Sequence, residues 1–480
     1  MVFSSITFLF YFLPIALLLY YVVPLRNPAL VAISLLFYAW GEPVYVLALL
    51  GSIAGNYGLA LAIDGRRDKA RRRMLLAGIA ANLIFLGAFK YADFALTTLA
   101  ALGGAFGLTA IAPASPGLGL TLPLGISFFT FHAMSYLIDV YRRDVAAERN
   151  PIHVALYFAL FPQLIAGPIV RFKTIVADIH RRRHSAELFA DGIRYFVVGL
   201  GMKVLLANNL AVPADAAFGL PGEQLYAALA WLGLICYGLQ IYFDFAGYSL
   251  MAIGLGLMFG FHLPVNFNYP YISQSLAEFW RRWHITLSAW FRDYVYIPLG
   301  GNRRGRVRTY FNLLAVFLLC GLWHGAAWTF VLWGLWHGAF LALERGAFGR
   351  MLARAWRPLR HIYCLVVVFA AWVLFRDDSF ARAGDYYRAL LGGADGDPRR
   401  NPIETYLNAE LWLVLVAAFA AATPLPAKAA TWLARRLAAR GMAGAAIVDG
   451  ARIVGLLALF VVAAAYLAGG AYNPFIYFRF

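Results

Sequence analysis

Long apolar stretches separated by short polar segments run through the whole sequence. Stretches near the roughly 20 residues that a helix needs to cross a bilayer lie at 3–23, 43–63, 74–93, 119–141, 192–212, 225–245, 406–422 and 451–470. Shorter ones lie at 28–41, 151–170, 248–263, 309–343 and 361–375. They show no strand alternation, and backbone in lipid must satisfy its own hydrogen bonds, so helices are predicted. The pattern predicts an all-α polytopic membrane protein with about ten crossings plus re-entrant segments, in one domain over residues 1–480.

Charged residues are few and are concentrated between the apolar stretches. The chain is 62% hydrophobic and 14% charged, and its formal net charge is +17. Its basic residues gather in short loops such as Arg71–Arg73, Arg181–Arg183 and Arg303–Arg308. Such loops are typical of the cytoplasmic side and attract anionic membrane lipid, so nucleic acid is not an expected partner. If the spans alternate in direction and these basic loops are cytoplasmic, both termini and the loops at 215–224 and 376–404 lie on the outer side of the membrane.

Two apolar stretches are flanked in a way that does not suit a simple crossing. Stretch 151–170 has basic residues at both ends and two helix-breaking prolines, so a re-entrant segment is predicted. Stretch 309–343 also lies between basic loops and is expected to form two pieces hinged near Trp323–Gly325. This hinge would hold His324 inside the membrane, where irregular backbone survives only when buried in protein or lining a wet cavity.

A polar and aromatic region precedes the hinge. Asn266–Tyr271, with its prolines, is predicted to be a loop that returns to the surface. Ser275–Phe291 has apolar residues at helical spacing, and Glu278 and Arg282 stand at i and i+4, where they form an ion pair on a helix. This pattern predicts one amphipathic helix lying at the cytoplasmic interface.

A histidine within the apolar run 317–328 is the strongest candidate for chemistry. An ionisable side chain at bilayer depth is costly, so His324 is a functional-site hypothesis by default. His284, among tryptophans and charges, is a second candidate, and the two imidazoles are expected to flank one buried path.

Five runs of residues, taken in order, resemble the membrane-bound O-acyltransferase (MBOAT) family: Leu122–Phe129, Phe161–Pro168, Tyr242–Tyr248, Glu278–His284 and Gly321–Gly325. Within the family the chain is similar to the AlgI-type proteins of alginate O-acetylation, and the D-alanyl-transferring DltB-type proteins are more distant. The resemblance extends over the whole chain, and five ordered motifs are more specific than any one alone.

The resemblance implies a ring of helices around a central tunnel that runs from a cytoplasmic funnel to the outer face. It implies an O-acetyltransferase of the bacterial inner membrane that holds no cofactor and moves acetyl groups from a cytoplasmic donor, expected to be acetyl-coenzyme A. The expected partners are periplasmic acetyltransferase proteins and an exported polysaccharide such as alginate. Matched by position, His324 is the family's signature histidine, and His284 is its other notable polar residue.

The chemistry of these residues agrees with acyl transfer. A base must take the proton of the acceptor hydroxyl, and imidazole titrates near neutral pH, so His324 is the candidate base. The tetrahedral intermediate needs hydrogen-bond donors for its oxyanion. His284, Arg282 and the backbone amides of Gly321–Gly325 are the alternatives, among which the sequence does not choose.

Five further residues are candidates for lining the tunnel or binding the donor: Arg281, Arg282, Asp244, Gln240 and Trp323. Gln240 and Asp244 share a helix face, because they stand at i and i+4, and are expected to be structural or tunnel-lining groups and not bases.

Two other histidine patterns are assigned no catalytic role. His337 repeats the Trp-His-Gly motif and is expected to be a packing residue or a support for the site. His180 and His184 have helical ligand spacing but bracket three arginines that would repel a cation, so no metal site is expected.

Alternative functions stay open at this point. The acceptor polymer of the acyltransferase can equally be peptidoglycan or cellulose. A secondary transporter would also have buried polar groups and broken helices, although no repeat of one half of the chain is visible in the other. A structural subunit of an export complex is a third reading, in which the histidines would be dispensable.

The aromatic C-terminal tail, residues 473–480, is expected outside the membrane after the last span. One interpretation is an interfacial anchor, for which aromatic rings are well suited. The other is that the tail folds back toward His324 and that Tyr477 accepts the acetyl group before passing it on, because tyrosine is among the side chains that form covalent intermediates.

Overall fold

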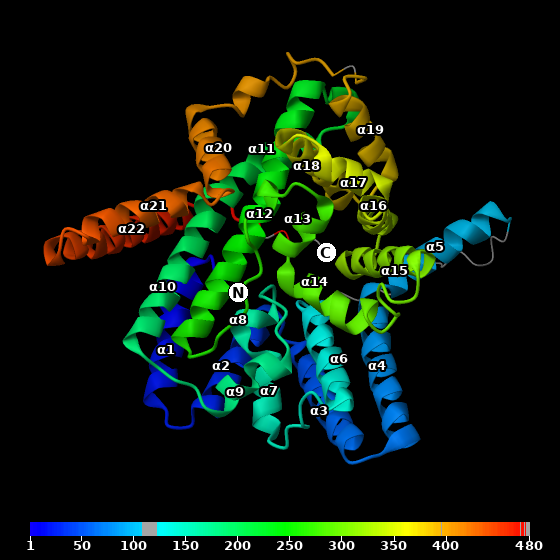
Figure 1. Cartoon of the computed structure of the whole chain (residues 1–480), viewed down its shortest axis with the longest axis vertical. Coiled ribbons are helices and arrows are strands. Elements are labelled where there is room, and N and C mark those ends of the chain that lie inside the picture. The colour runs from blue at the N-terminus through cyan, green and yellow to red at the C-terminus, as the bar shows by residue number, and fades with distance from the viewer. Residues whose placement is uncertain (108–121, 395, 471, 475, 477–480) are drawn as a thin grey trace.

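The computed structural model describes residues 1–107, 122–394, 396–470, 472–474 and 476, and this part of the chain is helical, without a β-strand (Figure 1). The helices of the first half are α1 (Leu13–Val22), α2 (Arg26–Gly41), α3 (Val46–Asp64), α4 (Asp68–Lys90), α5 (Ala92–Ala105), α6 (Ile126–Arg142), α7 (Pro151–Ala159), α8 (Phe161–Leu164), α9 (Phe172–His180), α10 (Ala186–Gly201), α11 (Asn208–Gly219) and α12 (Ala227–Met258). Those of the second half are α13 (Leu276–Arg282), α14 (Ile285–Phe291), α15 (Arg306–His324), α16 (Trp328–Glu344), α17 (Ala347–Arg354), α18 (Arg357–Arg376), α19 (Phe380–Leu390), α20 (Ala409–Ala421), α21 (Leu425–Ala438) and α22 (Met442–Ala468).

Among the described residues, seven helices are long and apolar enough to cross a membrane, or eight if the pair α20 and α21, bent by 72°, counts as one span. The sequence predicts about ten crossings. Part of the difference lies in α12, because the stretches at 225–245 and 248–263 form this single helix instead of two pieces. The first apolar stretch forms the shorter helix Phe8–Val22.

The long helix α12 forms the centre of the molecule, and most of its side chains are buried. It packs closely on α10 through pairs of glycines: a Cβ added at Gly199 would meet the carbonyl oxygen of Gly247 at 2.5 Å, and one added at Gly254 would meet that of Gly192 at 2.5 Å. Small residues that let two backbones approach are typical of membrane helix pairs. In contrast, α21 and α22 project from the body as a hairpin (Figure 1).

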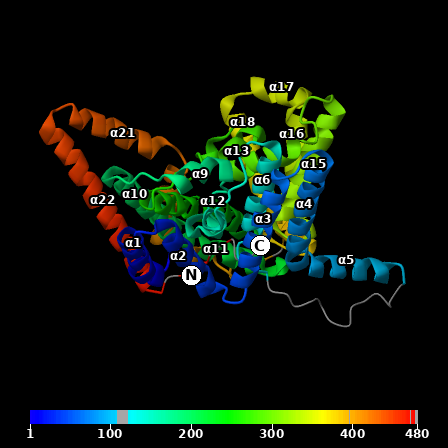
Figure 2. The same cartoon turned by 90° about the horizontal axis from the view of Figure 1, so that it is seen from below.

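The basic helix α17 and the N-terminus lie toward opposite edges of the molecule. Figure 2 shows α17 at one edge and the N-terminus and α5 toward the opposite edge. Ser4 and Asn473 join the two ends of the chain, because the Asn473 amide donates to the Ser4 carbonyl oxygen at 2.7 Å. Which of these edges faces the cytoplasm stays a prediction from the charge pattern.

The hinge prediction is confirmed. Stretch 309–343 forms the adjacent helices α15 and α16, which are broken at 325–327 immediately after His324. Stretch 151–170 forms the short buried helices α7 and α8, in agreement with a re-entrant segment.

The helix prediction for the segment before the hinge is wrong. Ser275–Phe291 is not one surface helix: it breaks into α13 and α14, and Phe279, Trp283 and Leu287 are buried in the core. The predicted loop is present and is exposed at Asn268, but its first residue, Asn266, is only 1% exposed. The cause is shared, because the backbone carbonyl of Asn266 accepts from Ile285 N at 2.9 Å and so pairs the two segments at the helix break.

Candidate active site

His324 is the last residue of α15 and is 6% exposed. Three aromatic rings enclose its imidazole at centroid distances of 4.9 Å (Trp323), 5.1 Å (Trp333) and 5.1 Å (Phe375). In the described part of the chain, no side chain hydrogen-bonds the ring nitrogens of His324. The imidazole is therefore held by packing and by its own backbone, and its nitrogens are available to a substrate.

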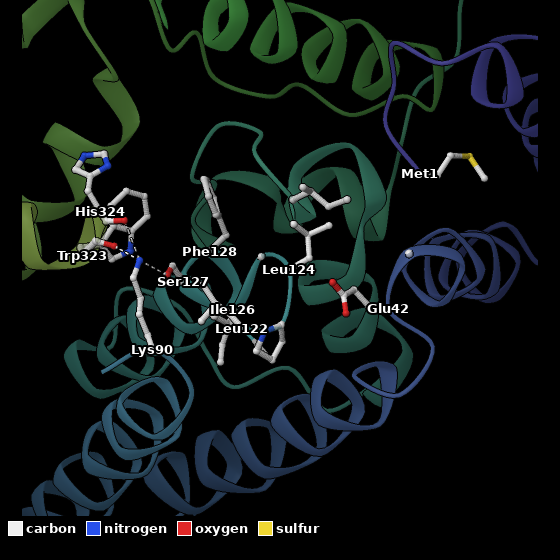
Figure 3. Close-up of a pocket in the computed structure, with 14 residues that line it drawn as sticks. Met1, Glu42, Lys90, Leu122, Leu124, Ile126, Ser127, Phe128, Trp323 and His324 are labelled. Atoms are coloured by element: carbon white, nitrogen blue, oxygen red, sulfur yellow. Dashed lines mark hydrogen bonds between the residues drawn. The ribbon is translucent and has the colours of Figure 1, made fainter. Parts of the chain in front are cut away.

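His324 lies between two cavities. The first cavity has a volume of about 380 Å³ and is lined by Met1, Glu42, Lys90, Ser127, Trp323, His324 and neighbouring residues. Figure 3 shows the backbone of His324 turned toward Lys90 in this cavity, with the imidazole on the other side.

A much smaller space of about 20 Å³ adjoins His324, Trp333, Trp372, Phe375 and Ile476. Such a volume holds about one water molecule, so a larger group enters only if side chains move.

A second large cavity continues outward from this small space. Its volume is about 320 Å³, and it shares Phe375 and Ile476 with the space beside His324. Gln240 lines it, as do the acidic residues Asp377 and Asp378. Residues near both ends of the chain line these cavities, Met1 in the first and Pro474 and Ile476 in the second, whereas the continuous tunnel that the resemblance implies stays a prediction.

His284 occupies the break between α13 and α14 in a left-handed conformation, φ 42°, which is uncommon for a residue other than glycine. Its Nδ1 lies 3.1 Å from Oδ1 of Asn266, and the same oxygen accepts from the backbone N (3.2 Å) and the hydroxyl (2.9 Å) of Thr286. Because a backbone N–H can only donate, the Asn266 atom is an acceptor, and Nδ1 of His284 carries a proton. In the neutral imidazole, Nε2 is then an acceptor.

This tautomer bears on the candidates for the oxyanion. Nε2 of His284 is buried without a partner among the described residues, and protonating it there would bury an unpaired charge at high cost. His284 therefore presents a lone pair and not a donor. Its ring packs edge-on to Phe245 at 4.6 Å and lies 6.2 Å from the ring of Trp323, which is itself 4.9 Å from the ring of His324.

Asp244 forms a buried ion pair that anchors the C-terminal tail. Its Oδ1 lies 2.7 Å from Nζ of Lys203, and both side chains are 2% exposed. Its Oδ2 accepts from the backbone N of Ile476 at 2.9 Å, and Lys203 also donates to the carbonyl of Pro474. The tail thus enters the protein as far as Ile476, beside the space that His324 lines. Tyr477 lies outside the described residues.

Among the remaining candidates, Trp323 is one of the rings that enclose the imidazole of His324, whereas the two arginines line none of the cavities beside it. Arg281 is exposed, and Arg282 pairs with Glu278 at 3.0 Å, which confirms the predicted i,i+4 pair. Trp323 stacks on Phe131 at 5.2 Å. His337 is buried and accepts from Nε1 of Trp280 at 3.3 Å, as suits a packing residue.

One group of possible metal ligands occurs in the part of the chain that the structure describes: Glu148, His153 and His180. It does not include His184, which instead lies 3.3 Å from the hydroxyl of Tyr20. Burial alone would raise the pKa of Glu148, but hydrogen bonds from Asn150 N and His180 lower it, so the carboxylate stays ionised and pairs with His180 at 2.6 Å. None of these residues belongs to the site at His324.

Sequence reasoning missed Asn266, Lys90 and Lys203. A signal existed for the two lysines, because each is a cation inside an apolar stretch, 74–93 or 192–212, and such residues mark functional or paired positions. Asn266 carried no comparable signal, because its role depends on its contacts with a distant helix break.

Comparison with known proteins decides the family. The model of the membrane-bound O-acyltransferase family matches residues 125–380, which include His284 and His324. The chain belongs to the membrane-bound O-acyltransferase family. It is therefore a multi-pass membrane enzyme that transfers acyl groups to oxygen.

Relatives of this O-acyltransferase cover most of its length. A probable alginate O-acetylase AlgI of Pseudomonas putida is 41% identical over 496 residues, which cover 100% of both chains. One of Azotobacter vinelandii is 44% identical over 399 residues, which are 82% of this chain and 79% of the relative. A peptidoglycan O-acetyltransferase of Helicobacter pylori is 37% identical and covers 82% of this chain and 80% of its own.

Proposed function

We propose that this O-acyltransferase moves acetyl groups from acetyl-coenzyme A on the cytoplasmic side of the bacterial inner membrane to the outer side, for O-acetylation of an exported polysaccharide such as alginate. The observation that carries the proposal is the imidazole of His324, buried among aromatic rings next to a cavity lined by Met1 and a small space lined by Ile476. The similarity to alginate O-acetylases supports acetyl as the acyl group.

In the proposed reaction, His324 is the general base. It takes the proton of the acceptor hydroxyl as the oxygen attacks the thioester carbonyl. The carbon–sulfur bond breaks, a carbon–oxygen ester bond forms, and the proton passes from His324 to the departing thiolate. The aromatic enclosure excludes water, which would otherwise hydrolyse the donor.

The C-terminal tail supplies a candidate acceptor within the protein. The ion pair of Lys203 and Asp244 holds Pro474 and Ile476, and Ile476 adjoins the space that His324 lines. In the relay that we propose, the phenol of Tyr477 accepts the acetyl group and passes it to a periplasmic acetyltransferase partner. Tyr477→Phe keeps an aromatic anchor and removes only the hydroxyl. Loss of polysaccharide acetylation in this variant is expected, and undiminished acetylation leaves the tail as an anchor only.

The test of the proposed function is His324→Gln, expressed in cells that lack their own copy of the protein. We expect the acetyl content of the exported polysaccharide to fall to background, because glutamine retains polarity and similar volume but is not a base at neutral pH. His337→Gln is the matched control, because glutamine can still accept from Trp280, and it should retain acetylation. Near-normal acetylation by His324→Gln, with the protein inserted at wild-type level, would refute a catalytic His324 and favour a structural subunit.

The acceptor polymer is a separate question, and the peptidoglycan O-acetyltransferase of Helicobacter pylori supports a second candidate. Acetyl analysis of purified exopolysaccharide and of peptidoglycan from the same cells distinguishes the two. Inverted membrane vesicles given radiolabelled acetyl-coenzyme A test the donor, since label should enter the protein or the vesicle lumen only if the thioester itself is used.

A further inference from the structure

The end of the helix that carries His324 is fixed by another helix. An α-helix leaves its last four carbonyl groups without partners inside the helix. At the end of α15, the carbonyl of Gly321 accepts from Gly325 N at 3.2 Å, which leaves those of Leu322, Trp323 and His324.

Two consecutive residues at the end of α4 satisfy all three remaining carbonyls. The hydroxyl of Tyr91 donates to the Leu322 carbonyl at 2.5 Å. The amino group of Lys90 donates to the Trp323 carbonyl at 2.6 Å and to the His324 carbonyl at 3.1 Å. Figure 3 shows Lys90 extended from α4 to these two carbonyls.

A lysine at the end of a span ordinarily extends its amino group toward water. Lys90 instead turns inward onto the partial negative charge at the end of α15, where a cation is favourable. The arrangement matters for His324, because no described side chain orients the imidazole by a hydrogen bond. The position of the ring therefore depends on the backbone of its own last helical turn.

We propose that Lys90 and Tyr91 are positioning residues for His324: together they cap the end of α15 and hold the imidazole among Trp323, Trp333 and Phe375. This inference rests on the proposed role of His324 as the base. The cap fixes the base in place, so the transfer step depends on it, whereas binding of the donor does not.

The test compares three variants purified in lipid nanodiscs, with acetyl-coenzyme A as the probe. Lys90→Met keeps the aliphatic stem and removes every donor, and Tyr91→Phe removes one hydroxyl. We expect kcat to fall by about 10–100-fold in Lys90→Met, as for a misplaced catalytic group, and by about 5-fold in Tyr91→Phe, with KM for the donor unchanged. Lys90→Arg, which retains donors, should recover part of the loss.

Asn312→Leu is the matched control for lost stability. The Asn312 amide is buried and donates to the Gly301 carbonyl at 2.9 Å, so this variant removes a tertiary hydrogen bond from α15 far from its His324 end. It should lower resistance to detergent unfolding without lowering kcat. A wild-type kcat in Lys90→Met, or an equal loss of kcat in Asn312→Leu, would overturn the inference.

Testing Lys90→Met also in the His324→Gln protein distinguishes a failure of this inference from a failure of the proposed function. In His324→Gln protein, adding Lys90→Met should have no further effect on the residual rate, because the group that it positions is already gone. Full activity of His324→Gln alone means that the proposed function has failed. An inactive His324→Gln with an unimpaired Lys90→Met means that only the positioning role has failed.

Discussion

The ion pair of Lys203 and Asp244 gives the sharpest test of how the structure holds its C-terminal tail. The change Lys203→Met keeps most of the side-chain volume and removes the charge. Both partners are 2% exposed and 2.7 Å apart, so the variant leaves a buried carboxylate without its cation. Breaking such a pair by removing one partner costs about 3–5 kcal/mol in the free energy of unfolding.

The double variant separates charge from packing. Replacing both partners, as in Lys203→Met with Asp244→Leu, leaves no buried charge, and such replacements are often neutral or stabilising. We therefore expect the double variant to be more stable than Lys203→Met alone. Arg452→Met is the surface control, because Arg452 and Asp449 are 62% and 69% exposed, and this change should cost less than about 1 kcal/mol.

The assay is unfolding in mixed micelles, read as the fraction of SDS at which half of the protein has lost its tertiary structure. Acetylation in cells is measured in parallel for Lys203→Met and for the double variant, because these changes also disturb the hydrogen bonds that hold Pro474 and Ile476. We expect polysaccharide acetylation to fall even in the double variant, since the tail loses its anchor. If Lys203→Met unfolds at the same SDS fraction as Arg452→Met, the buried pair does not stabilise the fold and the reasoning is refuted.

Two further predictions concern the surroundings of the site. Asn266→Leu should unfold the protein at lower SDS fractions and abolish acetylation, because it leaves donors of His284 and Thr286 buried without an acceptor, and each such donor costs about 1–3 kcal/mol of stability. Asn266→Asp keeps an acceptor and should have a milder effect. Equal behaviour of the two variants would contradict this account. If the exposed loop of Arg303, Arg304 and Arg306 steers the phosphates of acetyl-coenzyme A, replacing all three with glutamine should raise KM for the donor and flatten its salt dependence, whereas an unchanged KM would leave these arginines as orientation signals only.

The sequence by itself determined the features that depend on local composition and spacing. Apolar length predicts membrane helices, the cost of an ionisable group in lipid singles out His324, and the spacing of Glu278 and Arg282 predicts their ion pair. The hinge after His324 also follows from local signals, because the basic loops at both ends of stretch 309–343 do not suit a single span. These properties need no knowledge of what the segment packs against.

Tertiary structure alone decided the contacts between segments far apart in the chain. Apolar periodicity favours a continuous helix through Trp283 and His284, but the hydrogen bonds that Asn266 accepts from residues 284–286 outweigh that local preference and break the helix. Likewise, Lys90 and Lys203 are cations inside apolar stretches, and only the packing of α4 against α15 and of the tail against α12 supplies their partners. A buried polar group is stable only where such a partner exists, and which distant residue provides it is set by the three-dimensional fold.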